Sequence, residues 1–106
     1  MNYFFTNVST FIQKAPVVQQ WSEMKAILGE YTARSPLDWT LPVVASKAVG
    51  GTTKQALPAA ATIACMQINL FLIDDLLDKD PRGWHHKVGV GGAANLAAAF
   101  RRWRQI

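Results

Sequence analysis

The sequence predicts an all-α fold, a bundle of helices, on the basis of three observations. Between residues 17 and 31, apolar side chains recur three and four positions apart, which is the spacing of one face of a helix. Between residues 56 and 73 the chain is almost wholly apolar, as in a helix at the centre of a bundle. The alternation and the Asn-Gly type turns that indicate β-strands are absent. The 106 residues are therefore expected to form a single helical region, 1–106, with one modest core.

Three helices are predicted in the first half of the chain. The first covers residues 3–13, where apolar side chains again follow the helical spacing. The second begins at Pro16, because proline suits a first helical turn, and continues through the apolar stripe that ends at residue 31. The third is expected to have Ser35 as its N-cap, a distortion at Pro42, and an end at Gly50.

Two further helices are predicted in the second half. Thr52 and Gln55 form a capping-box pattern at the start of the fourth helix, although Pro58 is expected to delay or kink it. This helix is expected to end near residue 79, before a loop that is rich in proline and glycine. The last helix is predicted over approximately residues 90–104, where many alanines permit close helix packing.

The overall charge gives no indication of a nucleic-acid partner. The formal net charge is +4, and three of these charges belong to Arg101, Arg102 and Arg104, so the remainder of the chain is nearly neutral. The single cysteine, Cys65, cannot form an internal disulfide. This favours a reducing, cytoplasmic location.

The apolar segment 56–73 approaches the length of a membrane span. It contains Pro58, Gln67 and Asn69, however, and it continues directly into acidic residues. No basic region followed by an apolar stretch and a cleavage site marks a secretory signal. We therefore predict that the chain is not transmembrane and that this segment forms the centre of the bundle.

Three carboxylates, Asp74, Asp75 and Asp78, follow the apolar segment. At about 100° per residue, Asp74 and Asp78 stack one turn apart on one helix face, with Asp75 beside them. Like charges at this spacing repel, and carboxylate oxygens with nearby phosphates are the ligands that Mg²⁺ prefers. Arg82 could hold such a phosphate through two hydrogen bonds. The alternative is a solvated helix end, although acids there oppose the helix dipole.

These residues resemble the first aspartate-rich motif of the trans-polyprenyl diphosphate synthases, Asp-Asp-x-x-Asp followed by Arg-Gly. The matching residues are Asp74-Asp75-Leu76-Leu77-Asp78 and then Arg82-Gly83. Gly89 and Gln67, which stands seven positions before the motif, also match, and the resemblance covers approximately residues 35–100. Terpene cyclases share the pentapeptide, so a terpene cyclase-like member of the same superfamily is an alternative.

The resemblance implies the N-terminal part of an isoprenoid-synthase-type fold and a Mg²⁺-dependent prenyltransferase of isoprenoid biosynthesis. In that family an allylic diphosphate ionises, and isopentenyl diphosphate attacks the carbocation and then loses a proton. By resemblance, Asp74 and Asp78 bind Mg²⁺, and Asp75 supports the catalytic site. Arg82 holds diphosphate oxygens. Gln67 stands where the family often has His or Gln near isopentenyl diphosphate; the alternative for Gln67 is an internal hydrogen bond to a neighbouring helix.

The chain departs from the family pattern in three ways. The Gly-Lys-x-x-Arg-Pro segment that binds isopentenyl diphosphate has only Arg34 as a basic counterpart, which leaves the binding of that substrate open. One arginine, not two, precedes Gly83, and no second aspartate-rich motif occurs. We therefore expect an N-terminal fragment that is inactive alone and whose uncovered helix faces favour a homo-oligomer such as a dimer. A noncatalytic helical partner of a synthase is the other alternative.

Overall fold

The computed structural model describes residues 2–105 and confirms the predicted all-α class. The helices are α1 (Asn2–Gln13), α2 (Pro16–Gln20), α3 (Ser22–Ala33), the 3₁₀ helix η1 (Leu37–Thr40), α4 (Leu41–Ala48), α5 (Thr53–Leu77) and α6 (His85–Arg101). Between residues 2 and 105 there is no β-strand.

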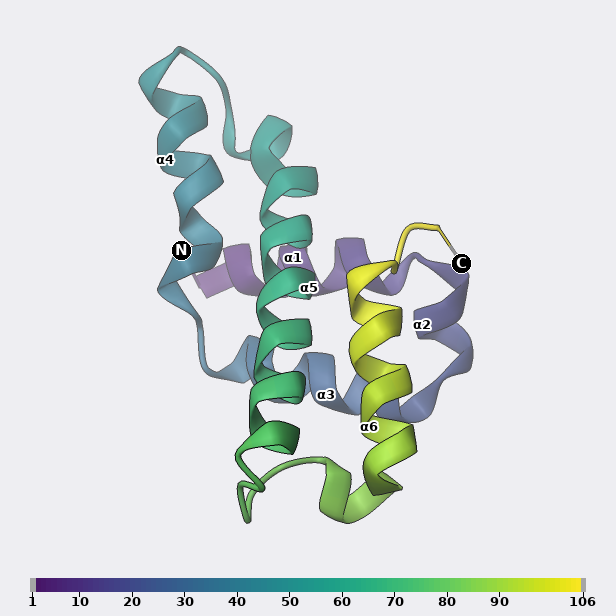
Figure 1. Ribbon diagram of the computed structural model, residues 1–106. Coiled ribbons are helices and arrows are strands. Elements are labelled where there is room, and N and C mark those ends of the chain that lie inside the picture. The colour runs from purple at the N-terminus through teal and green to yellow at the C-terminus, as the bar shows by residue number, and fades with distance from the viewer. Residues whose placement is uncertain (1, 106) are drawn as a thin grey trace.

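Helix α5, the longest, is the centre of the fold. It packs against α6, α4, α1 and η1, so most of the molecule is built around it. Helices α4 and α6 lie on either side of α5, whereas α1 and α3 cross behind it (Figure 1). The opposite face of α5, which is turned toward the viewer in Figure 1, is not covered by another helix of the described chain. The chain therefore forms two layers of helices, with the core between them.

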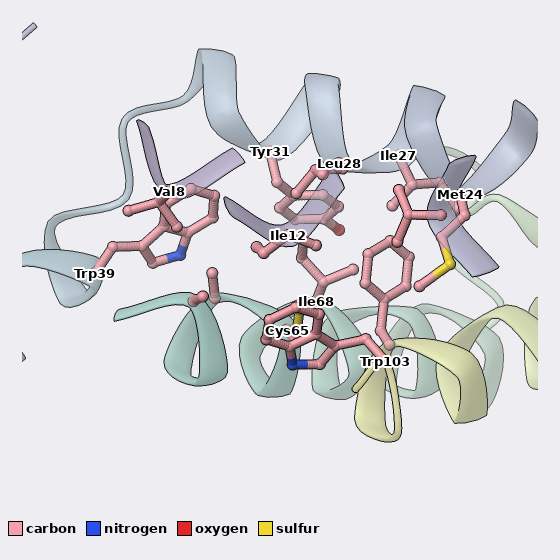
Figure 2. Packing of buried hydrophobic residues seen from close by; sticks show 14 of the residues in the cluster. Val8, Ile12, Met24, Ile27, Leu28, Tyr31, Trp39, Cys65, Ile68 and Trp103 are labelled. Carbon is pink, nitrogen blue, oxygen red and sulfur yellow. The ribbon is translucent and has the colours of Figure 1, made fainter. Parts of the chain in front are cut away.

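The core consists of apolar side chains from both layers (Figure 2). Val8 and Ile12 of α1 are fully buried, as are Ile27 and Leu28 of α3, and they meet Ile68 of α5. Towards its N-terminal end, α5 contributes mainly small side chains to the core. Its buried alanines are Ala56, Ala60, Ala61 and Ala64. Small side chains at a helix contact shorten the distance between the helix axes, which explains how one long helix packs against several others.

The start of α5 is formed as the capping-box pattern predicts. The Thr52 hydroxyl accepts a hydrogen bond from the backbone N–H of Gln55, and the Gln55 side chain accepts one from the backbone N–H of Thr52. The delay expected at Pro58 is wrong, because α5 begins at Thr53 and Pro58 lies inside it; the kink that was the other alternative stays a prediction. Helix α5 ends at Leu77, and Lys79 then adopts a left-handed backbone conformation with φ 54°. Such a residue commonly ends a helix.

The predicted second helix is divided at Trp21, whose backbone is extended (φ −122°, ψ 99°). Val18 and Met24 are both fully buried. In one continuous helix these two side chains would point about 120° apart, because six residues span 1.67 turns of a helix with about 3.6 residues per turn. The break between α2 and α3 therefore allows both side chains to enter the same core.

The predicted third helix also differs from the structure. Ser35 is not its N-cap, because its backbone is left-handed (φ 48°), and Pro36 precedes η1 instead. The 3₁₀ helix places the indole of Trp39 in the core, where its side chain is fully buried. Pro42 falls in the first turn of α4, where proline causes no distortion.

The last helix begins at His85, five residues earlier than predicted. It contains a kink at Gly89, whose backbone (φ 81°, ψ 165°) is one that other residues rarely adopt. Residues 78–84 form the loop between α5 and α6. This loop and the neighbouring helix ends carry most of the candidate site.

Helix α5 is long enough and apolar enough to span a membrane, by length and composition alone. Core helices of water-soluble proteins meet the same criteria, so this property does not test the prediction that the chain is not transmembrane.

Candidate active site

A cavity of about 350 Å³ lies where α3, the C-terminal end of α5 and the loop 78–84 meet. It is lined by charged and aromatic side chains: Glu30, Tyr31, Arg34, Phe71, Asp75, Asp80, Arg82 and Trp84. The cavity therefore contains Asp75 of the aspartate-rich motif, Arg82, and the one basic residue of the stretch before η1, Arg34.

The loop that carries Arg82 is organised by Asp80. The Asp80 carboxylate accepts hydrogen bonds from the backbone N–H of Arg82 (2.8 Å) and from its guanidinium (3.4 Å to Nε). The backbone N–H of Asp80 donates to the carbonyl of Asp75 (2.9 Å), and the N–H of Gly83 donates to the carbonyl of Asp80 (3.0 Å). These bonds fold the loop back onto the end of α5. The Arg82 side chain remains 91% exposed, so its guanidinium can reach a ligand.

Gly83 allows this loop to approach α5 closely. A Cβ at this position would lie 3.2 Å from the Asp75 Cβ and would collide with the His85 ring. Gly83 itself is buried. A larger residue would push the loop and the His85 side chain away from Asp75, so the Arg-Gly sequence has a physical role in building the cavity.

Helix α3 forms the opposite wall. Glu30 accepts a hydrogen bond from Trp84 Nε1 (2.9 Å) and pairs with Arg34 (3.2 Å). The guanidinium of Arg34 lies over the ring of Tyr31 at 4.4 Å, and Tyr31 stacks on Phe71 of α5 with ring centroids 5.7 Å apart. These contacts connect α3 to both α5 and the loop. They fix Arg34 at the rim of the cavity.

The electrostatic environment differs between the two aspartates of the cavity. Partial burial raises the pKa of Asp75, and the negative charge of Asp80 raises it further. Hydrogen bonds from Arg82 lower the pKa of Asp80. Burial also raises the pKa of the Tyr31 hydroxyl. Of these two aspartates, Asp75 is thus the one whose negative charge is less compensated by the protein, and a bound cation would stabilise that charge.

The structure separates the three aspartates of the motif. Asp74 and Asp78 are exposed and do not line the cavity, whereas Asp75 is half-buried within it. Between residues 2 and 105, no group of three or more His, Cys, Asp or Glu side chains is arranged so that it could hold a metal ion. The assignment of Asp74 and Asp78 as Mg²⁺ ligands stays a prediction.

Gln67 lies outside the cavity and bonds to η1. Its Oε1 accepts a hydrogen bond from the indole Nε1 of Trp39 (2.8 Å), and its Nε2 donates to the Asp38 carboxylate (3.1 Å). The internal hydrogen bond that was one of the two alternatives for this residue is therefore formed. A role near isopentenyl diphosphate would require Gln67 to share or exchange these partners.

The aromatic and acidic residues of the α3 wall were not predicted as part of a site. Tyr31 belongs to the apolar stripe of its helix, a pattern that indicates a core residue, and it is both buried and part of the cavity lining. The spacing of Glu30 and Arg34, four positions apart on one helix, is the local signal that could have indicated a fixed guanidinium. No sequence signal connects Glu30 to Trp84, which is 54 positions away.

Comparisons of this chain with protein-family models, with curated proteins and with solved structures find no match. The interpretation of the site therefore depends on its residues and geometry.

Proposed function

We propose that this chain is the diphosphate-binding part of a Mg²⁺-dependent prenyltransferase that condenses an allylic diphosphate with isopentenyl diphosphate. The observation that carries the proposal is the meeting of two guanidinium groups, from Arg34 and Arg82, at one cavity beside Asp75. These arginines come from segments far apart in the sequence, and the fold brings them together at the end of the aspartate-rich helix.

The two arginines are suited to hold a diphosphate group. A guanidinium presents paired N–H donors that match the oxygens of a phosphate, and two such groups can share the charge of a diphosphate. Each is now paired with a carboxylate, Arg34 with Glu30 and Arg82 with Asp80, at 3.2 and 3.4 Å. Both pairs are solvent-accessible, and exposed pairs are worth little in free energy. A diphosphate could therefore displace the carboxylates at small cost.

The aspartates of α5 supply the donor set that Mg²⁺ requires. Asp75 faces the cavity with a carboxylate whose charge is only partly compensated, and Asp74 and Asp78 stand beside it on the exposed side of the helix. Mg²⁺ binds to one or two carboxylates together with waters and phosphate oxygens, so three protein ligands are not needed. When bound, the metal would neutralise negative charge on the departing diphosphate.

The uncovered face of α5 is suited to an isoprenoid chain. Met66 and Leu70 are 41% and 56% exposed, and they lie on the same side of the helix as Asp74. Phe71, at 40% exposed, lies between this face and the cavity. An allylic chain extending from a diphosphate at the cavity would thus run along apolar side chains. A second layer covering this face would exclude water from the carbocation, as such chemistry requires.

Binding of a non-ionising analogue tests the proposal without requiring turnover. The ligand is geranyl thiolodiphosphate, and the method is isothermal titration calorimetry with and without Mg²⁺. We expect Mg²⁺-dependent binding that is weakened by Arg82→Ala and that loses its Mg²⁺ dependence in Asp74→Asn/Asp78→Asn. Arg102→Ala, which removes the same charge far from the cavity, is the matched control and should bind as the unaltered chain does. Equal binding with and without Mg²⁺, or none at millimolar analogue, would contradict the proposal.

The exposed apolar face also suits a second candidate function, a noncatalytic helical subunit of a larger synthase. Met66 and Leu70 of α5 are exposed on it, and Leu41 and Val44 of the neighbouring α4 are exposed as well. Under this alternative the chain associates with a longer synthase and changes its product without binding the analogue itself. Co-purification from the native source, followed by the same calorimetry, distinguishes the two functions. The predicted cytoplasmic location and dimeric state remain proposals under both.

A further inference from the structure

A second pocket lies at the opposite end of α6 from the aspartates. It has a volume of about 240 Å³ and is lined by Phe11, Lys14, Ala15, Pro16, Trp103 and Arg104. The end of α1, the turn before α2 and the turn after α6 meet there, and Figure 1 shows the C-terminal end of the chain beside the start of α2. The pocket shares no lining residue with the first cavity. Helix α6 runs between the two, since Trp84 before it lines the first cavity and Trp103 after it lines this pocket.

The walls of this pocket are aromatic. Phe11 and Trp103 meet edge to face with ring centroids 6.0 Å apart. Trp103 is buried and therefore fixed, whereas Phe11 is only half-buried and presents part of its ring to the pocket. Ala15 contributes a small side chain, so the space beside the two rings stays open. A flat apolar group is the shape that such walls accommodate best.

Among the described residues that line the pocket, Lys14 and Arg104 are cationic and none is acidic. The Lys14 ammonium lies 5.9 Å from the Phe11 centroid, and the Arg104 guanidinium lies 5.5 Å from the same centroid and 5.3 Å from that of Trp103. In the part of the chain that the structure describes, neither cation forms an ion pair. Arg101 and Arg102 add positive charge at the same helix end. An anion at the rim would therefore meet two cations already held over the rings.

We propose that this pocket binds a small aromatic carboxylate, with its ring packed beside the Phe11–Trp103 pair against Ala15 and its carboxylate on Lys14 and Arg104. Pockets for drug-sized ligands have volumes of about 300–1,000 Å³, so this one fits a smaller molecule. A guanidinium binds a carboxylate through two parallel hydrogen bonds, and an aromatic ring adds the apolar contact. The site is independent of the proposed prenyltransferase activity.

The test uses 1-naphthoate as the probe and the whole chain, with binding followed by chemical shifts of the tryptophan indole N–H groups. The uncharged 1-naphthalenemethanol tests the need for the carboxylate, and inorganic phosphate tests the need for the ring. Lys14→Ala/Arg104→Ala should weaken naphthoate binding by at least about tenfold, since a charged hydrogen-bonded pair contributes that much. Arg101→Ala/Arg102→Ala removes the same charge outside the pocket and is the matched control; it should weaken binding less than about threefold, by screened charge alone.

A second variant fills the pocket without changing its charge. Ala15→Leu should abolish naphthoate binding while the spectrum of the core stays unchanged. The proposal is wrong if both arginine-containing double variants weaken binding equally, because the effect is then one of overall charge. It is equally wrong if the uncharged alcohol binds as tightly as naphthoate, or if Ala15→Leu binds normally.

Discussion

Replacing Gln67 by methionine is expected to destabilise the fold by leaving a buried donor without a partner. The indole of Trp39 is fully buried, and its N–H donates to Gln67 Oε1 at 2.8 Å. Methionine has a similar shape but offers only a weak acceptor, so the substitution should cost about 1–3 kcal/mol, the typical penalty for an unsatisfied buried polar group. For a chain of this length, each kcal/mol lowers the midpoint of thermal unfolding by roughly 4–5 °C.

Urea unfolding measures this cost, and a double-mutant cycle assigns it to the one hydrogen bond. Trp39→Phe removes the donor, so Gln67→Met should cost about 1 kcal/mol less in that background than in the unaltered chain. Gln19→Met, on an exposed position of α2, is the matched control and should change stability by less than about 0.5 kcal/mol. If Gln67→Met and Gln19→Met have the same effect, the reasoning about Trp39 is refuted. If Gln67→Met lowers stability but leaves binding of the diphosphate analogue unchanged, its role is structural only.

Three further predictions concern helix ends and the charge in the cavity. Thr52→Ala should lower stability by about 1 kcal/mol, because it removes the capping hydroxyl of α5; no loss in urea unfolding would contradict this. Lys79→Gly should raise stability by about 0.5–1 kcal/mol, because glycine tolerates the left-handed conformation at the end of α5; a lower thermal midpoint would refute it. Asp75→Asn should stabilise the protein at neutral pH. The raised pKa of Asp75 means that its ionised form is disfavoured by folding, so stability is lost as pH rises through that pKa, and the advantage of the variant should vanish at pH values below the ordinary aspartate pKa. An advantage that is independent of pH would show that the Asp75 charge is not its cause.

Features that depend on neighbouring residues could be predicted from the sequence. The start of α5 follows from Thr52 and Gln55, because a capping box is completed within one helical turn. The closeness of Asp75 and Arg82 likewise follows from a short loop after the helix. The break at Trp21 could not be predicted, since it arises from two residues on different helix faces that share one core, and that core exists only after the chain has folded.

The composition of the site was predictable only in part for the same reason. Glu30 and Trp84 meet through the packing of α3 against the end of α5, and neither residue carries a local signal of this contact. Periodicity places Asp74, Asp75 and Asp78 on one side of a helix, but it does not say how that helix is rotated within the bundle. The structure shows that Asp75 enters the cavity and that Asp74 remains outside it.

Which of the aspartates lines the cavity depends on how α5 packs, and that packing involves residues far from the aspartates. The buried alanines of α5 set the distance between this helix and its neighbours, because their small side chains allow close packing in this orientation. A bulky residue at Ala60 or Ala64 would overpack this contact, at a cost of about 1–3 kcal/mol, and would push α5 away from its neighbours. The position of Asp75 in the cavity thus depends on residues further along α5 that take no part in the site.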